Sequence, residues 1–358
     1  MWGVTANPAQ SIAGATTGQA QRVAVINAGG WGTALAVKLA KQGHDVRLWT
    51  RRAELAEQIR LQGENRQYLP GVRIPPTVQV TARLEAALEQ ADAVVVAVIA
   101  GYMREMATAL GGLLTVDAMV VHGTKGLEPA TGRRLSAVLA AELGLRWAGR
   151  IGVLAGPNHA EEVACELPTA AVIACEDPEV AVRLQALLAS PWFRVYTNPD
   201  PIGVELCSAA KNVIAIAAGI GDGLGYGDNA KAALITRAVA EIGRLVASQG
   251  GSFGTVAGLA GVGDVVATCT SRHSRNRWAG EQIGLGRSLQ EIVASTPMVI
   301  EGVPATQAIV ALARDAKVEM PICEGVFRVA FEGQGPRDAL RELFARDTTS
   351  EGLLPEGW

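Results

Sequence analysis

The sequence of 358 residues lacks an excess of either charge, because 35 Asp and Glu nearly balance 32 Lys and Arg. With a net charge of −3 it offers no basic surface, so we expect no nucleic-acid partner. It also lacks an apolar run long enough to cross a bilayer, so we expect no integral membrane segment. The five cysteines lack metal-ligand spacing and are odd in number, which indicates reduced thiols in a cytoplasmic protein and no metal site.

We expect no signal peptide either. Residues 1–20 have no basic start followed by an apolar block, and we expect a flexible extension there. Residues 346–358 are expected to form a C-terminal tail. The remaining chain, rich in hydrophobic residues (49% of the whole), has the composition of a packed globular protein and is too long for one ordinary core. We therefore expect two domains.

The most informative segment that is present covers residues 22–36, in which an apolar strand, a glycine-rich turn and a helix start follow one another. The turn contains Asn27-x-Gly29-x-x-Gly32, whereas the dinucleotide-binding pattern is Gly-x-Gly-x-x-Gly. Asn tolerates a positive φ better than other non-glycine residues, so the tight turn can survive the exchange. The segment predicts a pyrophosphate at the positive end of a helix dipole. By itself the motif also occurs in α/β proteins that bind nothing.

Short apolar runs alternate with helical patterns through the first half, which predicts a parallel sheet covered by helices. The expected strands are 23–26, 45–49, 93–98, 119–122, 151–154, 170–174 and 194–197, with helices at 33–42, 52–60 and 84–89 and a turn at 68–71. Helices alone are expected afterwards, at 205–220, 230–247, 289–294, 305–314, 325–331 and 337–345. The predicted fold class is therefore α/β, with a dinucleotide-binding domain over 21–200 and a helical substrate domain over 201–345.

The end of the second expected strand bears on the choice of cofactor. An acid at this point selects the ribose hydroxyl of NAD, whereas an arginine suits the 2′-phosphate of NADP. Here Arg51 and Arg52 follow the strand, so NADPH is favoured over NADH. The alternative is a solvated helix start, although cations are unfavourable at a helix N-terminus. Trp31, inside the glycine turn, is expected either in the core or as a wall of the cofactor cleft.

One lysine in the second half lies in an apolar helix. The segment 205–217 is apolar nearly all round, so Lys211 is expected to be buried. Burial lowers the pKa of an ammonium group toward the range of a general acid or base. The alternative is a buried stem that carries the ammonium to water. Glu205 and Asn212 nearby favour a lysine that faces a cleft.

Three further segments carry side chains suited to an anionic ligand. Asp264 ends a glycine-rich loop, where it is suited to cap the helix that follows and to orient a lysine or a substrate hydroxyl, two compatible roles. Ser274, Arg275 and Asn276 suit a phosphate, with a solvated basic loop as the alternative. Lys125 follows a strand, and open α/β sheets bind ligands at that edge.

Taken in order, these segments resemble the bacterial NAD(P)-dependent sn-glycerol-3-phosphate dehydrogenase family over roughly residues 21–345. The segments that carry the resemblance are Gly29-Gly30-Trp31-Gly32-Thr33-Ala34-Leu35-Ala36, Leu48-Trp49-Thr50-Arg51-Arg52, Tyr68-Leu69-Pro70-Gly71, Thr124-Lys125-Gly126, Ala155-Gly156-Pro157-Asn158-His159-Ala160-Glu161-Glu162-Val163, Glu205-Leu206-Cys207, Lys211-Asn212-Val213, Gly261-Val262-Gly263-Asp264, Cys269-Thr270-Ser271, Ser274-Arg275-Asn276-Arg277 and Ile300-Glu301-Gly302-Val303. The resemblance implies an N-terminal Rossmann-type doubly wound sheet, a C-terminal all-α domain and an active site between them. It also implies reduction of dihydroxyacetone phosphate to sn-glycerol 3-phosphate with NAD(P)H, for glycerophospholipid synthesis.

The resemblance further implies roles for single residues. Lys211 matches the residue that transfers the proton, and Asp264 is expected to keep it aligned. The positions that match substrate-binding residues are Lys125, Gly156, Asn158, Lys211, Asp264, Ser274, Arg275 and Asn276. The positions that match cofactor-binding residues are Gly29, Gly30, Trp31, Gly32, Arg51, Arg52, Tyr68, Lys125, Ala160, Arg275, Val299 and Glu301.

The chain departs from the family pattern at four places. Asn27 replaces a Gly, Gly30 a usual Ser, Ile99-Ala100 a usual Pro-Ser, and Ser208 a usual Gly. The first and third departures touch the cofactor site. They leave open a non-catalytic NAD(P)-binding sensor, and a dehydrogenase of another small phosphorylated ketone is a further alternative. A homodimer is compatible with the sequence, which does not determine the oligomeric state.

Overall fold

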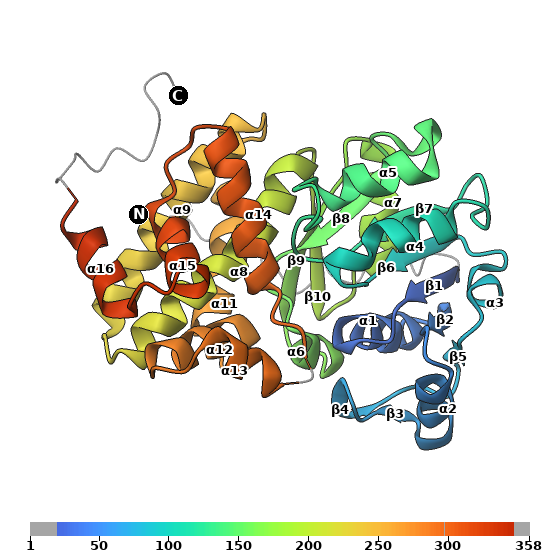
Figure 1. The fold of residues 1–358 in the computed structure, drawn as a ribbon. Coiled ribbons are helices and arrows are strands. Elements are labelled where there is room, and N and C mark those ends of the chain that lie inside the picture. The colour runs from blue at the N-terminus through green and yellow to red at the C-terminus, as the bar shows by residue number, and fades with distance from the viewer. Residues whose placement is uncertain (1–19, 297, 347–358) are drawn as a thin grey trace, which may run out of the picture.

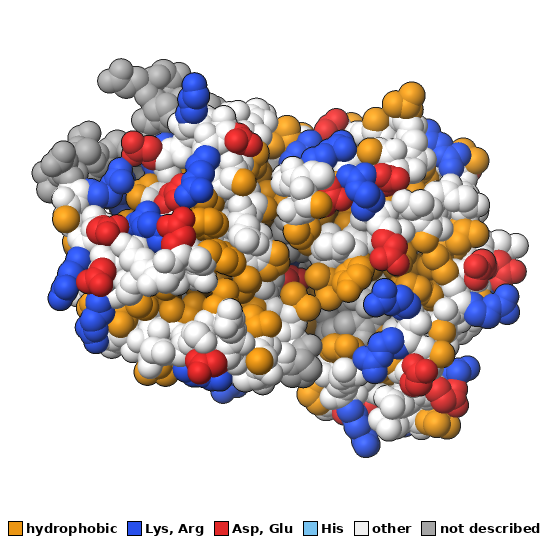
Figure 2. Space-filling model, in the orientation of Figure 1, with side chains coloured by type: hydrophobic (Ala, Val, Ile, Leu, Met, Phe, Trp, Pro, Cys, Tyr) orange, Lys and Arg blue, Asp and Glu red, His pale blue; other side chains and the backbone are white. Residues whose placement is uncertain are grey.

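The computed structural model describes residues 20–296 and 298–346. The predicted extension over 1–20 and the tail over 346–358 therefore lie almost wholly outside the described residues. A half built on a sheet and an all-helical half lie side by side (Figure 1). The surface is hollowed where the two halves meet (Figure 2).

The first half contains an eight-stranded sheet in the order β10-β9-β8-β7-β6-β1-β2-β5. The strands are β1 (Arg22–Ile26), β2 (Asp45–Trp49), β5 (Gln79–Thr81), β6 (Ala93–Val96), β7 (Met119–His122), β8 (Ile151–Ala155), β9 (Thr169–Ala174) and β10 (Phe193–Asn198). The central strands β6 and β7 are buried along their whole length, as expected for runs of apolar, largely β-branched residues in a sheet covered on both faces.

Helices cover both faces of this sheet, so the fold is doubly wound. Helices α1 (Gly30–Lys41), α2 (Ala53–Gln62) and α7 (Pro178–Leu188) pack on one face. Helices α3 (Leu84–Leu88), α4 (Met103–Leu110) and α5 (Leu135–Leu143) pack on the other. The predicted fold class is confirmed.

Two details of the predicted sheet are wrong. Strand β9 runs antiparallel to β8, and β10 follows the direction of β9, so the sheet is parallel only from β5 to β8. The connection between β8 and β9 holds only the five-residue helix α6 (Ala160–Ala164), which is too short to carry the chain back across the sheet for a parallel strand. The turn predicted at 68–71 belongs instead to a hairpin, in which β4 (Leu69–Arg73) pairs with β3 (Glu64–Asn65).

The second half is a bundle of helices around α8 (Pro201–Gly223). Its other elements are α9 (Asp228–Ser248), α10 (Phe253–Val256), a π-helical turn (Leu259–Gly263), α11 (Asp264–Thr270), α12 (Arg275–Gly284), α13 (Leu289–Ala294), α14 (Gly302–Asp315), α15 (Pro321–Phe331) and α16 (Pro336–Phe344). Helices α10 and α12 were not predicted, because α10 has four residues and the sequence of α12 is mostly polar.

Helix α8 is long and apolar enough to cross a membrane, but 89% of its most apolar window is buried inside the protein, which is typical of a core helix. A second apolar stretch, Phe253–Thr270, passes the same test and is broken into several short helical elements. The backbones of α8 and α12 approach closely. A Cβ added at Gly219 would lie 1.9 Å from the Arg277 carbonyl oxygen, and one at Gly280 would lie 2.0 Å from the Ile216 carbonyl oxygen.

Candidate active site

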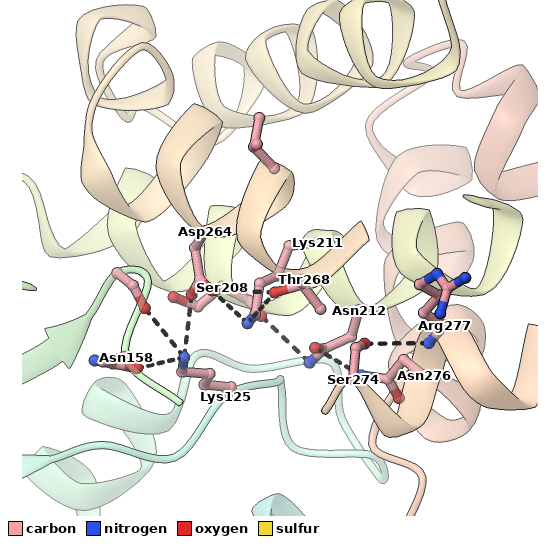
Figure 3. Close-up of polar contacts among 12 residues, drawn as sticks. Lys125, Asn158, Ser208, Lys211, Asn212, Asp264, Thr268, Ser274, Asn276 and Arg277 are labelled. Carbon is pink, nitrogen blue, oxygen red and sulfur yellow. Dashed lines mark hydrogen bonds and ion pairs between the residues drawn. The ribbon is translucent and has the colours of Figure 1, made fainter. Parts of the chain in front are cut away.

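Two lysines from opposite halves meet on one carboxylate (Figure 3). Lys211 Nζ, on α8, donates to Asp264 Oδ1 at 2.6 Å, and Lys125 Nζ, from the loop after β7, donates to Asp264 Oδ2 at 3.1 Å. Lys211 is 4% exposed and Asp264 is 2% exposed. The Lys211 ammonium therefore does not extend to bulk water, and a buried carboxylate bridges two cations.

This arrangement sets the charges of the cluster. Burial lowers the pKa of Lys211 to about 8, against the raising effect of Asp264 and with further lowering by Lys125. Burial raises the pKa of Asp264, but Lys125 and Lys211 outweigh it and hold this pKa below its usual value. Asp264 stays ionised, whereas Lys211 can release or take up a proton near neutral pH.

Asp264 begins α11, directly after the π-helical turn. The N-cap of this helix is Gly263, and the Asp264 carboxylate accepts from Lys211, Lys125 and Thr268, so Asp264 does not merely cap the helix. Thr268, one helical turn further on, accepts from Lys211 Nζ at 2.8 Å and donates to Asp264 Oδ1 at 3.2 Å. Sequence reasoning missed Thr268, although its spacing of four residues from Asp264 places both on one helix face.

The loops after β7 and β8 hold Lys125. Its ammonium donates to Asn158 Oδ1 at 2.7 Å and to the Gly156 carbonyl at 3.3 Å. Gly156 has φ +114°, a conformation that favours glycine. His159, the next residue after Asn158, was also missed, although it lies between two positions that the resemblance identified. Burial lowers its pKa, and Lys211 and Lys125 lower it further, which places its ring near the cluster.

The predicted phosphate-binding segment starts helix α12. Ser274 is its N-cap, with Oγ accepting from the Arg277 amide at 3.2 Å. Asn276 is buried, donates to Asn212 Oδ1 at 2.9 Å and accepts from the Gly302 amide at 2.9 Å. Arg275 is exposed and donates to the Val299 carbonyl at 3.0 Å. The segment is thus a helix start in the helical half that carries Lys211, and not a solvated loop.

Glu205 does not lie where the sequence reasoning expected it. Its carboxylate accepts from Ser136 and Arg134 of the sheet half, and neither of its oxygens bonds to Lys211 or Lys125 among the described residues. Glutamate and lysine six residues apart on a helix point in different directions, which explains the difference. Asn212, by contrast, joins the site through Asn276.

The glycine turn after β1 keeps its shape despite Asn27. This residue has φ 91°, and its Nδ2 donates to the Ala97 carbonyl at 2.9 Å. A Cβ at Gly32 would lie 2.0 Å from the Asn27 carbonyl oxygen, and one at Gly30 would lie 2.8 Å from the Tyr68 carbonyl oxygen. The backbone therefore approaches as closely as a dinucleotide-binding turn requires.

The start of α1 fits a pyrophosphate. Its N-cap, Gly29, makes no side-chain cap, and its first turn contains no acid. Trp31 in this turn is partly buried and lies over Gly123, and its indole Nε1 has no hydrogen-bond partner among the described residues. Asn65, missed by sequence reasoning, supports the turn by donating to the Ala28 carbonyl at 2.8 Å. Free helix-terminal amides of this kind suit phosphate groups.

The predicted adenosine-side residues lie at the end of β2. Arg52 donates to the Tyr68 hydroxyl at 3.3 Å, and the Arg51 guanidinium carbon lies 5.2 Å from the centre of the Tyr102 ring. Both arginines are exposed, and Arg52 is also the N-cap of α2, so the helix-start alternative is compatible with a binding role.

The remaining predicted cofactor residues lie elsewhere along the cleft. Ala160 starts α6, with its Cβ 4.0 Å from a Cβ added at Gly30. Val299 and Glu301 precede α14 in the helical half. Burial raises the pKa of Glu301, and Arg275, Lys211 and Lys125 lower it, which places Glu301 on the cluster side.

A doubly wound sheet with an open helix N-terminus, and a lysine–aspartate cluster where it meets a helical half, define a class: the dinucleotide-dependent oxidoreductases. Two family profiles match the chain, the N-terminal part of the NAD-dependent glycerol-3-phosphate dehydrogenases over residues 22–181 and the C-terminal part over 200–341. The chain belongs to the NAD-dependent glycerol-3-phosphate dehydrogenase family.

Individual relatives agree with this assignment. A glycerol-3-phosphate dehydrogenase of Chlorobium limicola, named for NAD(P)+, is 49% identical over 92% of this chain and 99% of its own. The enzyme of the same name from Bacillus pumilus is 47% identical over 92% of this chain and 96% of its own. The crystal structure of glycerol-3-phosphate dehydrogenase from Coxiella burnetii matches with a TM-score of 0.86 and 40% identity, covering 91% of this chain and 99% of its own.

Proposed function

We propose that this protein reduces dihydroxyacetone phosphate to sn-glycerol 3-phosphate with NAD(P)H, reversibly, and so feeds glycerophospholipid synthesis in the cytoplasm. The observation that carries the proposal is the buried Lys211, whose pKa of about 8 suits proton transfer to a developing alkoxide. The family membership supports the same reaction, because the relatives are named glycerol-3-phosphate dehydrogenases.

Each residue of the cluster has a distinct part in this reaction. When bound, NAD(P)H would supply a hydride for the C2 carbonyl carbon. Lys211 Nζ gives a proton to the carbonyl oxygen, and Asp264 and Thr268 fix the direction of that ammonium. Lys125 and Asn158 contact the substrate from the sheet half. The turn keeps its shape around Asn27, which supports cofactor binding; a non-catalytic sensor and a dehydrogenase of another small phosphorylated ketone are distinguished from this reaction by turnover of dihydroxyacetone phosphate.

Substrate anchoring comes from the start of α12. Ser274, Arg275 and Asn276 bind the phosphate there, so that binding energy remote from the carbonyl holds it beside the nicotinamide. Lys211 lies in the same half, on α8, which packs directly against α12. The phosphate and the proton donor are therefore presented by one packed unit.

The sheet half would hold the cofactor. Gly29, Gly30 and Gly32 would hold the pyrophosphate, with Trp31 and Ala160 lining this part of the site. Arg51, Arg52 and Tyr68 would hold the adenosine end, where the two arginines favour NADPH over NADH. Lys125, Arg275, Val299 and Glu301 would complete the site from the cleft. Residues 21–200 thus form the dinucleotide-binding domain and 201–345 the substrate domain, with ligand contacts from both in the cleft; a homodimer is compatible with this division.

Lys211→Met tests the proton-transfer role. It should abolish measurable oxidation of NADPH by dihydroxyacetone phosphate, followed at 340 nm, while NADPH still binds. Lys38 provides a matched control, because it is also buried, with a pKa lowered to about 7, but donates to the Leu188 carbonyl beneath the sheet. Lys38→Met should retain turnover. Near wild-type turnover in folded Lys211→Met would refute the assignment.

A further inference from the structure

Glu205 is a buried acid outside the lysine cluster that joins the two halves. It lies on α8 and is 1% exposed. Its Oε1 accepts from the Ser136 amide at 2.8 Å, and its Oε2 accepts from Arg134 Nη1 at 3.1 Å and from the Ser136 hydroxyl. His122 Nε2 lies 3.3 Å from Oε1. All three neighbours belong to the sheet half, so this carboxylate is a contact across the boundary.

The environment keeps Glu205 ionised. Ser136 is in the first turn of α5, a helix whose N-cap residue Arg134 makes no side-chain cap, so the carboxylate of Glu205 occupies the positive end of that helix. Burial raises the pKa of Glu205, but His122, Arg134 and Ser136 together hold it below its usual value. A buried charge satisfied in this way fixes its partners in place, because separating them would leave the charge unpaired.

Glu205 and its neighbour His122 lie in the two segments that carry the lysines. His122 is the last residue of β7, three residues before Lys125. Glu205 itself is on α8, six residues before Lys211. The Lys125–Asp264 contact of 3.1 Å depends on how the loop after β7 is set against the helical half.

We propose that Glu205 is a positioning residue, which holds the Lys125 loop and helix α8 at the separation that one Asp264 carboxylate can bridge. Its role in turnover rests on the proposed function. Glu205 does not belong to the substrate-contacting set and acts only through the two lysines.

The proposal predicts a specific change in Glu205→Gln. Weakening the boundary contact withdraws Lys125 from Asp264 and admits water beside Lys211. Both effects raise the pKa of Lys211, because burial and Lys125 lower it in the intact protein. The loss of turnover at high pH should then occur at a higher pH than in the wild type.

The lost charge of Glu205 itself acts in the opposite direction, by lowering the Lys211 pKa, so Ser136→Ala, which keeps that charge, isolates the effect of position. The other groups that face Lys211 do not reverse the expected direction. The charged and titratable ones are Asp264, Lys125, His159 and Glu301, and the thiol of Cys269, whose pKa of about 12 keeps it neutral. All except Lys125 and His159 belong to the same half as Lys211, so they keep their places when the boundary loosens.

Glu205→Gln should lower turnover much more than it weakens cofactor binding. A misplacement of about 1 Å in an active site lowers kcat by up to about 100-fold, so we expect a fall in kcat of that order. The Kd for NADPH should change much less than kcat, because the glycine turn and the two arginines lie within the sheet half. A merely destabilising substitution would lower the melting temperature without moving the pH profile.

Glu241→Gln is the matched control. Glu241 is 2% exposed and accepts from the Ile322 amide at 2.9 Å, entirely within the helical half. This substitution should change stability but leave the pH profile of turnover in place. Ser136→Ala removes one donor to Glu205 from the opposite side, and should move the profile in the same direction as Glu205→Gln by a smaller amount. Ser136→Ala therefore tests the proposal even if Glu205→Gln fails to fold.

The closing experiment measures the Lys211 pKa without turnover. A limiting dose of acetic anhydride is applied across pH 6–11, in the range of lysine titration, and acetylation of the Lys211 peptide is quantified by mass spectrometry in wild type, Glu205→Gln, Ser136→Ala and Glu241→Gln. A higher Lys211 pKa in the first two variants alone supports the proposal. An unchanged pKa in folded Glu205→Gln or Ser136→Ala overturns it. A wild type that does not turn over dihydroxyacetone phosphate would refute the proposed function, while the labelling result would still decide the role of Glu205.

Discussion

Replacing Asp264 by Asn should shift the pH dependence of reduction downward. The Asp264 carboxylate contacts Lys211 Nζ at 2.6 Å and raises its pKa, so the wild-type value of about 8 already includes this support. In Asp264→Asn the negative charge that raises the Lys211 pKa is lost, whereas the positive charge of Lys125 remains nearby. Both effects favour the neutral amine, so the Lys211 pKa must fall.

The size of the shift follows from the contact distance. An opposite charge at this range moves a pKa by roughly 1 to 3 units, so the Lys211 pKa should fall to roughly 5–7. At pH 8 the protonated fraction then drops from about half to roughly a tenth or less, and kcat/KM for reduction should fall by roughly 5-fold or more. Because the protonated amine is the required form, activity should recover as the pH is lowered.

The assay is the initial rate of NADPH oxidation at 340 nm with dihydroxyacetone phosphate, measured across pH 5 to 9.5 around the expected pKa values. Thr268→Val is the matched control, since it removes a neutral hydrogen bond to the same ammonium at 2.8 Å but no charge. Its high-pH limb should shift much less. A high-pH limb of Asp264→Asn that stays in place or moves upward would show that Asp264 does not set the Lys211 pKa.

Two further substitutions test the cofactor site. Arg52→Ala should raise the KM for NADPH by roughly 10-fold or more, because it removes a charge-assisted hydrogen bond, and should leave the KM for NADH nearly unchanged. Equal effects on both cofactors in steady-state kinetics would show that Arg52 does not contact the 2′-phosphate. Asn27→Gly should change the Kd for NADPH, measured by Trp fluorescence titration, by less than about 10-fold, because the turn already has φ 91° and only the Ala97 hydrogen bond is lost. Much tighter binding would instead mean that Asn27 weakens the turn.

The sequence predicted the features of the molecule that depend on local patterns. The β-branched run at 93–98 and the apolar run at 119–122 became buried central strands, and the long apolar segment around Lys211 became the core helix α8. A local hydrophobic pattern is sufficient to predict such an element, because the burial of a strand or helix can be inferred from its own residues.

Features that depend on tertiary pairing were not predictable in the same way. The direction of β9 is set by the short connection before it, and the apolar pattern of a strand is the same in either direction. Helix α12 packs through glycine backbone contacts, which hydrophobic periodicity does not predict. The partners of Glu205 lie about 70 residues away, at Arg134 and Ser136, so its position could be learned only from the fold.

The near contact of the α8 and α12 backbones limits how this protein can evolve. At Gly219 and Gly280 not even a methyl group fits, so the two helices cannot slide or swivel without losing their packing. Under the proposed function one helix carries the proton donor and the other begins at the anion anchor. Together they fix the distance between the proton donor and the anion anchor, and therefore the distance between the carbonyl and the phosphate of the substrate. Acceptance of a longer or shorter ketone would therefore have to come from changes in the loops of the opposite half.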